Sequence, residues 1–241
     1  MAGVSIKKIS GYLEKDGLNI IDTNVYIVSY GKSAAMIDIG GGYEQVINYL
    51  KEKDLDLKYI FLTHSHFDHI YYLDDLKQMY PEAKVVASIK SKIKDEDVTL
   101  IKDINGESIK TDIDIFVKDK DKIFLGSNKI YENIDIKEKI ENGIVNLSKD
   151  SGIEFNILDT PGHTIDSICI IMVYKDKEIL FSGDTIFKDS IGRTDFKTGS
   201  IELMEDTLKR LKRIIKDNVL VLPGHGENTS FKDWKKVFYR L

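Results

Sequence analysis

The stretch that most constrains this chain is "FLTHSHFDHI", residues 61–70. It sets three histidines and one aspartate directly after an apolar run: His64, His66, Asp68 and His69. The 241 residues contain only two other histidines, His163 and His225, and each ends the tripeptide PGH after another apolar run. Because proline cannot continue a central ladder and glycine permits a tight bend, each PGH is expected to end a strand and to turn its histidine outward.

Strand-like and helix-like segments alternate along the chain, which is typical of a layered α/β fold. Apolar runs rich in β-branched residues predict strands at residues 24–30, 34–40, 57–63, 84–88, 153–159, 168–174, 178–183 and 219–223. Apolar residues at helical spacing predict one helix over residues 43–53 and a second marked by Ile201, Leu208, Leu211, Ile214 and Ile215. Asp184 follows its strand as the histidines follow theirs. Four strands are therefore expected to deliver metal-capable side chains to one edge of the structure.

The length of the chain suits one large domain or two small ones. We find no internal repeat and no linker-like tract, so a single domain over residues 1–241 is expected. Residues from about 90 to 143 differ from the rest, since they are rich in Lys, Asp, Glu and Ile and show only weak periodicity. We expect this segment to elaborate the domain, as a lid or an added hairpin, rather than to form a second fold.

The composition indicates an ordinary soluble globular protein. The hydrophobic fraction is 42%, and the net charge of -5 gives no global attraction to nucleic acid or to an anionic membrane. The first residues lack the apolar core of a signal peptide and no later run is long enough for a membrane span, so we expect a cytoplasmic protein with a small-molecule partner. The one cysteine, Cys169, lies in "SICIIMV" and is expected to be a buried small hydrophobe. The oligomeric state is left open.

The donor types define the chemistry that the histidines and aspartates can support. Imidazole nitrogen and carboxylate oxygen suit zinc, manganese or iron, and the absence of cysteine argues against a closed structural zinc site. Five histidines with Asp68 and Asp184 are enough donors for two metal ions about 3.5 to 4 Å apart. The sequence therefore predicts an open catalytic site with two divalent metal ions, with zinc favoured and iron or manganese compatible.

These residues, together with "GDTIFKDSIGRTDF" at 183–196, resemble the metallo-β-lactamase superfamily, most closely its hydroxyacylglutathione hydrolase (glyoxalase II)-like members. The resemblance covers nearly the whole chain except the elaboration. It implies a four-layer αββα sandwich of two mixed sheets with helices outside. It also implies three ligand roles: a first metal on His64, His66 and His163, a second on Asp68, His69 and His225, and Asp184 as the bridge.

The resemblance extends to two residues beside these ligands and has limits elsewhere. Asp38 in "MIDIGGG" resembles the structural aspartate of the family, and Arg193 in "GRTD" is expected either to orient a ligand loop or to meet substrate. The family usually has small residues after His69, whereas this chain has "IYYLDDL", whose tyrosines we expect to pack. "PGHTIDS" carries Asp166 where the family usually has glycine. The chain ends sixteen residues after His225, without the further helical domain of glyoxalase II, so glutathione specificity is not implied.

The leading hypothesis is hydrolysis of a thioester or another ester-like bond by a metal-bound hydroxide. In this hypothesis Asp68 orients the hydroxide or carries its proton to the leaving group.

Three alternatives stay open. The segment "GRTDF" also resembles persulfide dioxygenases, which use a single iron, although "PGHGENT" around His225 fits hydrolases better. Some superfamily members are nucleases, and the basic stretch 209–216 could be cited for that activity. Its apolar residues share one helical face, which is typical of a solvated helix, and the acidic overall charge also argues against nucleic acid. A scaffold that has lost catalysis is the last alternative.

Overall fold

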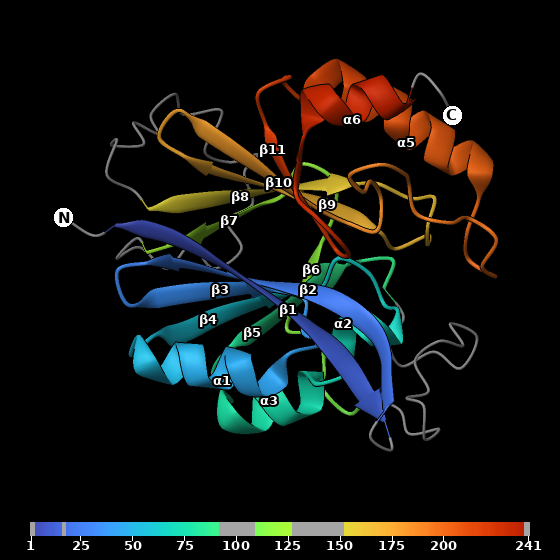
Figure 1. Cartoon of the computed structure of the whole chain (residues 1–241). Coiled ribbons are helices and arrows are strands. Elements are labelled where there is room, and N and C mark those ends of the chain that lie inside the picture. Colours follow the sequence, from blue (N-terminus) through green and yellow to red (C-terminus); the bar gives the residue numbers. More distant parts are fainter. Residues whose placement is uncertain (1–2, 16–17, 92–108, 127–151, 239–241) are drawn as a thin grey trace.

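The computed structural model describes residues 3–15, 18–91, 109–126 and 152–238. Within them, two six-stranded sheets lie face to face, with helices on their outer surfaces (Figure 1). The first sheet has the order β1 (Val4–Lys15), β2 (Leu18–Tyr30), β3 (Ser33–Ile37), β4 (Asp56–Phe61), β5 (Lys84–Ser88) and β6 (Ile115–Val117). In it β2 pairs antiparallel with both β1 and β3, and β3 to β6 run parallel.

The second sheet is also mixed. Its order is β12 (Thr229–Ser230), β11 (Leu220–Pro223), β10 (Lys177–Gly183), β9 (Ile168–Tyr174), β8 (Ile153–Asp159) and β7 (Lys122–Leu125). Its strands pair antiparallel except for the parallel pair β10 and β11. The helices are α1 (Tyr43–Glu52), α2 (Phe67–Ile70), α3 (Leu73–Met79), α5 (Ile201–Ile214) and α6 (Phe231–Phe238). In Figure 1, α1 and α3 cover the first sheet, and α5 and α6 cover the second. The predicted αββα sandwich is confirmed.

The alternation of side chains along each strand divides the apolar residues among three cores. On β2, Val25 and Ile27 face the helix side, whereas Tyr26 faces the opposite sheet. The layer between the sheets contains aromatic contacts across it, such as Phe61 of β4 against Phe155 of β8, with ring centroids 5.0 Å apart. Both faces of each sheet are therefore buried, which explains why the strands in the sequence are nearly continuous apolar runs.

The outer core beneath α5 and α6 corrects two details of the predicted helix. Leu208, Leu211 and Ile215 are buried, but Ile201 and Ile214 are 48% and 47% exposed. At 100° per residue Ile214 is about 120° away from Leu208, so it belongs to the solvent side of the helix. Cys169 of β9 is fully buried in this core, as expected, and burial raises the pKa of its thiol to about 11.

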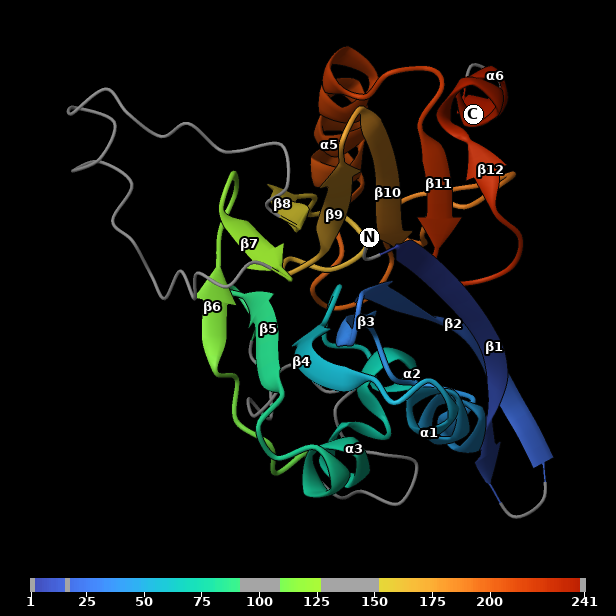
Figure 2. The same ribbon diagram turned by 90° about the vertical axis from the view of Figure 1, so that its left-hand side faces the viewer.

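The elaboration predicted at about 90–143 is in part integral to the sandwich. Figure 2 shows β6 and β7 at the same end of the two sheets, where β6 pairs with β5 and β7 pairs with β8. These two strands are not a separate hairpin, because each extends a different sheet. Residues 92–108 and 127–143 lie outside the described residues, so the expectation of a lid is not addressed there.

Two further features concern the N-terminal strand and the helices. The strand β1 was not predicted, because Lys7 and Lys8 interrupt the alternation between Ile6, which packs between the sheets, and Ile9, which packs on the helix side. Within the described residues, no helix combines the length and the hydropathy that a membrane crossing requires.

Candidate metal centre

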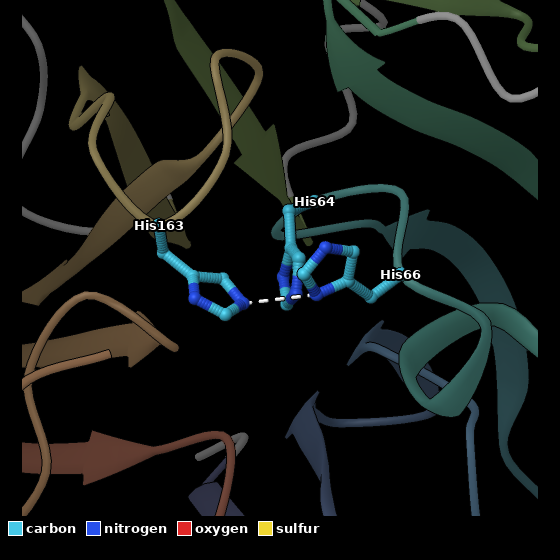
Figure 3. A group of neighbouring side chains, drawn as sticks. All are labelled: His64, His66 and His163. Carbon is cyan, nitrogen blue, oxygen red and sulfur yellow. Dashed lines mark hydrogen bonds between the residues drawn. The ribbon is translucent and has the colours of Figure 1, made fainter. Parts of the chain in front are cut away.

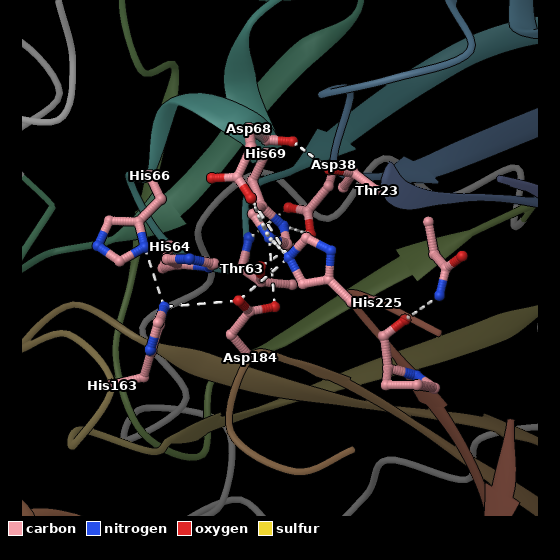
Figure 4. Close-up of polar contacts among 12 residues, drawn as sticks. Thr23, Asp38, Thr63, His64, His66, Asp68, His69, His163, Asp184 and His225 are labelled. Atoms are coloured by element: carbon pink, nitrogen blue, oxygen red, sulfur yellow. Dashed lines mark hydrogen bonds and ion pairs between the residues drawn. The ribbon is translucent and has the colours of Figure 1, made fainter. Parts of the chain in front are cut away.

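The predicted ligands meet where several strands end. The motif of residues 61–70 follows β4, Asp184 directly follows β10, and one histidine follows each of β8 and β11. Figure 4 shows the side chains pointing toward one another from both halves of the sandwich. The structure thus brings together all seven residues that the sequence singled out: His64, His66, Asp68, His69, His163, Asp184 and His225.

These side chains form three overlapping groups in which the donor atoms lie within 4.8 Å of one another, and one of the three joins Asp184 to His64 and His69. The first ligand group is His64, His66 and His163 (Figure 3). The second ligand group is Asp68, His69 and His225. In the first, His66 Nδ1 lies 2.9 Å from His163 Nε2. In the second, His225 Nε2 lies 3.3 Å from both His69 Nε2 and Asp68 Oδ2.

Asp184 lies between the two ligand groups. Its Oδ2 is 3.5 Å from His163 Nε2 of the first group and 3.3 Å from His225 Nε2 of the second. Its Oδ1 is 3.2 Å from His69 Nε2. A single carboxylate can therefore reach donors on both sides, which is the position that the predicted bridge requires.

The donor set fits a divalent cation. The Nε2 atoms of His64 and His66 are buried and have no hydrogen-bond partner. Buried polar atoms are normally paired, so unpaired imidazole nitrogens beside a carboxylate indicate a site that a metal ion completes. Nitrogen and carboxylate donors without thiolate favour zinc, iron or manganese over calcium or magnesium.

Contacts on the other ring nitrogen orient several of these histidines. The Nδ1 of His163 donates to the carbonyl of Arg193 at 2.7 Å, and the Nδ1 of His225 donates to the carbonyl of Asp22. His64 Nδ1 lies 3.1 Å from the Thr63 hydroxyl. Each of these contacts leaves Nε2 free to point into the cluster.

Asp38 lies beside the ligands, where the family resemblance placed it. Its Oδ2 is 2.8 Å from His69 Nδ1, and its two oxygens accept hydrogen bonds from the backbone N–H and the hydroxyl of Thr63. Arg193 contributes its carbonyl to the cluster, while its guanidinium pairs with the Asp195 carboxylate at 2.6 and 2.7 Å. Of the two expected roles of Arg193, the described contacts match the orientation of a ligand loop.

Burial favours the neutral form of the histidines in the first ligand group. It lowers the pKa of His64 and of His163, and it lowers the pKa of His66 to about 3. The first ligand group is therefore neutral, which is the form that binds a metal.

In the second ligand group, carboxylates outweigh burial. Burial alone would lower the pKa of His225, but hydrogen bonds to Asp184 and Asp68 raise it to about 10. The pKa of His69 is raised in the same way, against burial, by Asp184, Asp38 and Asp68. The pKa of Asp184 is held low, against burial, by His69 and His225. Without a bound cation, the positive charge of the protonated histidines balances the negative charge of the carboxylates.

Some residues of the site were not foreseen. Thr63 precedes the motif directly, and its position in "LTHSH" was the available signal. Phe187 and Phe196 belong to the quoted 183–196 segment, but nothing in their spacing marks them as neighbours of the histidines. The carbonyl of Asp22 is separated from His225 by 203 positions, and a backbone acceptor carries no sequence signal.

The departures from the family pattern have structural explanations in part. The ring of Tyr72 stacks on that of Tyr43 with centroids 5.1 Å apart and packs against the core of the first sheet, in agreement with a packing role. Asp166 is buried, and burial raises the pKa of its carboxyl. Hydrogen bonds from the side chains of Thr164, Ser65 and Ser91 to this carboxyl oppose the effect of burial.

Comparison with known proteins agrees with this geometry. The family model described as the metallo-beta-lactamase superfamily matches residues 19–225, which include every residue discussed above as a ligand. The hydroxyacylglutathione hydrolase GloC of Haemophilus influenzae is 31% identical over 205 residues, which cover 85% of each chain. The probable metallo-hydrolase YqgX of Bacillus subtilis is 29% identical over 87% of each chain.

Solved structures show the same architecture. The B3 metallo-beta-lactamase BLEG-1 superposes with a TM-score of 0.72 at 26% identity, covering 95% of both chains. ETHE1 from Myxococcus xanthus superposes with a TM-score of 0.64 at 25% identity, covering 89% of this chain and 77% of its own. On the fold, the converging histidines and the matched family model, this chain belongs to the metallo-β-lactamase superfamily.

Proposed function

We propose that this protein is a hydrolase that holds two divalent metal ions, with zinc favoured, and that it cleaves a thioester or another ester-like bond in a small molecule in the cytoplasm. The observation that carries the proposal is the position of Asp184 between the two ligand groups, within 3.5 Å of a histidine in each. His64, His66 and His163 would hold one ion, Asp68, His69 and His225 the other, and Asp184 both.

The metal ions, when bound, supply a lowered pKa for a coordinated water and an electrophile for the substrate carbonyl. The protein fixes the position of this site through contacts to the Nδ1 atoms of three histidines. His69 Nδ1 contacts the Asp38 carboxylate, and the Nδ1 atoms of His163 and His225 donate to the carbonyls of Arg193 and Asp22. Asp68 is the proposed proton carrier. Despite its burial, His69 and His225 lower the pKa of its carboxyl, so Asp68 is a carboxylate, and the oxygen that is not used as a ligand can accept a proton and pass it to the leaving group.

The relatives support this reaction class. An acyl group joined to glutathione through sulfur is a thioester, and one relative is named a hydroxyacylglutathione hydrolase. Nucleic acid is not favoured as a partner, because cations of the basic stretch 209–216 are engaged by carboxylates. Arg210 pairs with Asp119, and Lys216 pairs with Glu178 at 2.7 Å.

The test compares metal content and thioester hydrolysis in wild type and Asp184→Asn. Elemental mass spectrometry on protein produced with zinc, iron and manganese available should give about two ions per chain. Asp184→Asn should lose most activity and much of the metal. Asp189→Asn, at an exposed aspartate of the same loop, is the matched control and should change neither. Full activity in Asp184→Asn would contradict the proposal.

A persulfide dioxygenase with one iron is the second candidate, favoured by "GRTDF" and by the likeness to the ETHE1 structure. One iron per chain and oxygen uptake with glutathione persulfide would establish it. The absence of oxygen uptake in iron-loaded protein would remove it.

A further inference from the structure

Two phenylalanine rings from one loop lie against the metal centre. The loop joins β10 to α5 and covers residues 184–200. The ring of Phe196 lies 4.6 Å from that of His66 and 5.3 Å from that of His163, measured between centroids. The ring of Phe187 lies 5.9 Å from that of His225. Both phenylalanines are half-buried, and neither has a donor atom for a metal, so the two rings are apolar walls of the site.

The ligand residues themselves hold this loop in place. It begins at Asp184, and its residue Gly192 lies so close to Asp184 that a Cβ would be 1.8 Å from the Asp184 carbonyl oxygen. The next residue, Arg193, accepts the hydrogen bond from His163. The position of Phe196, three residues later, is therefore fixed relative to the first ligand group.

Exposed apolar side chains also occur on two segments that backbone hydrogen bonds join near Phe196. The backbone N–H of Gly199 donates to the carbonyl of Phe196, and that of Ser200 donates to Gly162, which joins the start of α5 to the loop that carries His163. These two segments expose Ile165, Ile201 and Leu203, by 39%, 48% and 37%. Leu203 lies on the side of α5 that contacts the loop carrying His163, because Met204 and Thr207 contact Gly162 and Pro161, whereas Ile201 points to a different side. We call Phe196, Ile165 and Leu203 the Phe196 rim.

Two cationic side chains, one beside Phe196 and one beside Phe187, each form an ion pair with a carboxylate. The Arg193 guanidinium pairs with Asp195 and lies 4.5 Å from the centre of the Phe196 ring. Lys188, beside Phe187 in the chain, pairs with Glu227 at 2.5 Å. Exposed pairs add little to stability, but they leave little net positive charge at this part of the described surface. The surroundings favour an apolar group over an anionic one.

We infer that the substrates carry an apolar acyl chain of several carbons, which lies along the Phe196 rim while the reacting carbonyl is at the metal centre. This inference rests on the proposed hydrolysis. In that reaction water adds across the acyl–sulfur bond: the acyl carbon gains the hydroxyl, the sulfur leaves with the proton as a thiol, and nothing is oxidised or reduced.

The test uses N-acetylcysteamine thioesters whose acyl chains lengthen from acetyl through butyryl and hexanoyl to octanoyl. With metal-loaded wild type, kcat/KM should rise about fourfold for each methylene that the rim fully covers. The rise should come from KM, because the chain contacts are equal in the ground state and the transition state. Matching uncleavable amide analogues, titrated calorimetrically into metal-free protein, should bind more tightly with chain length in the same way.

Two substitutions of similar size separate apolar contact from structure. Phe196→Leu keeps an apolar side chain and should keep the chain-length dependence, whereas Phe196→Asn should flatten it, so that kcat/KM for the octanoyl thioester falls toward that for the acetyl thioester. Phe116→Ala is the matched control, because Phe116 is 53% exposed on β6 and lies outside the rim. Metal content measured on each variant shows whether the first ligand group is intact.

The outcomes separate the inference from the proposed function. Hydrolysis of all thioesters without dependence on chain length would overturn the inference and leave the hydrolase in place. A chain-length dependence that Phe196→Asn leaves unchanged would also overturn it, because the chain would then bind elsewhere. If no thioester is hydrolysed by metal-loaded protein, the proposed function itself fails.

Discussion

The Oδ2 atom of Asp38 lies 2.8 Å from Nδ1 of His69, and both side chains are buried. The same carboxylate accepts hydrogen bonds from Thr63, so it joins the end of β3 to the end of β4. Asp38 has a φ of 59°, a conformation that is uncommon for residues other than glycine. Backbone strain at this position is therefore combined with the orientation of a ligand, as often happens at functional sites.

Asp38→Ala should lower the affinity for a metal ion bound by His69 by about 10- to 100-fold, because His69 loses the partner that fixes its ring and its tautomer. Competition with a chromogenic zinc chelator measures this affinity. Asp54→Ala is a matched control, since Asp54 also has a positive φ, of 50°, but is exposed. Unchanged affinity in Asp38→Ala would show that His69 needs no support.

The two ligand groups should lose their metal ions at different pH values. Histidines of the first group have lowered pKa values and are already neutral, whereas those of the second group have raised values, about 10 for His225, and must release protons when a metal binds. As pH falls, protons compete for His69 and His225 first, so the second ion should be lost at a higher pH than the first. Metal content per chain after dialysis at stepwise lower pH measures this order. Simultaneous loss of both ions would contradict it.

Much of the site could be predicted because its signals are local. Residues 153–159 and 168–174 form strands over the predicted ranges, since the first run alternates apolar and polar residues, the second is continuously apolar, and both are followed by turn residues. The ligand motifs follow strands directly, and the polar residues after a strand end cannot lie far from the edge of the sheet.

The remainder depended on contacts between distant parts of the chain. The strand β6 has only three residues and β7 only four, and charged residues surround both, so neither showed a strand pattern of its own. Their pairing with β5 and β8 is what forms them. The partners of the ligands were equally hidden: nothing near Asp38 in the sequence indicates that its carboxylate contacts Thr63 and His69.

Gly40→Ala should disrupt the site by displacing the backbone near Asp68 and His69. A Cβ at Gly40 would lie 1.4 Å from the carbonyl oxygen of Asp68 and 2.9 Å from the amide nitrogen of His69, so one of the two segments must move. We expect a loss of about 2–3 kcal/mol in the free energy of unfolding, by analogy with overpacked cores, together with reduced metal content. Urea denaturation of metal-free protein measures the first. Gly3→Ala, where nothing lies within 4 Å, is the control, and equal denaturation midpoints for the two variants would contradict the prediction.

Asp166→Asn should change how stability depends on pH. Burial raises the pKa of this carboxyl above its ordinary value of 3.8, so the folded protein holds the proton more tightly than the unfolded chain. Stability contributed by the neutral carboxyl is then lost as pH rises from about 4 through the folded pKa, by about 1.4 kcal/mol for each unit of the shift.

The amide that replaces the carboxyl in Asp166→Asn stays neutral at every pH, so the variant should gain stability relative to wild type across that range and match it more closely in acid. Urea denaturation of both proteins at pH values between about 4 and 8 gives the difference, in which the titration of the shared groups cancels. Because Asp166 lies one residue before Ser167, whose hydroxyl is 2.7 Å from that of Thr164, near-wild-type metal content in the variant would show that the loop carrying His163 is intact. A stability difference that is constant with pH, or that moves in favour of wild type as pH rises, would show that the Asp166 carboxyl is ionised in the folded protein.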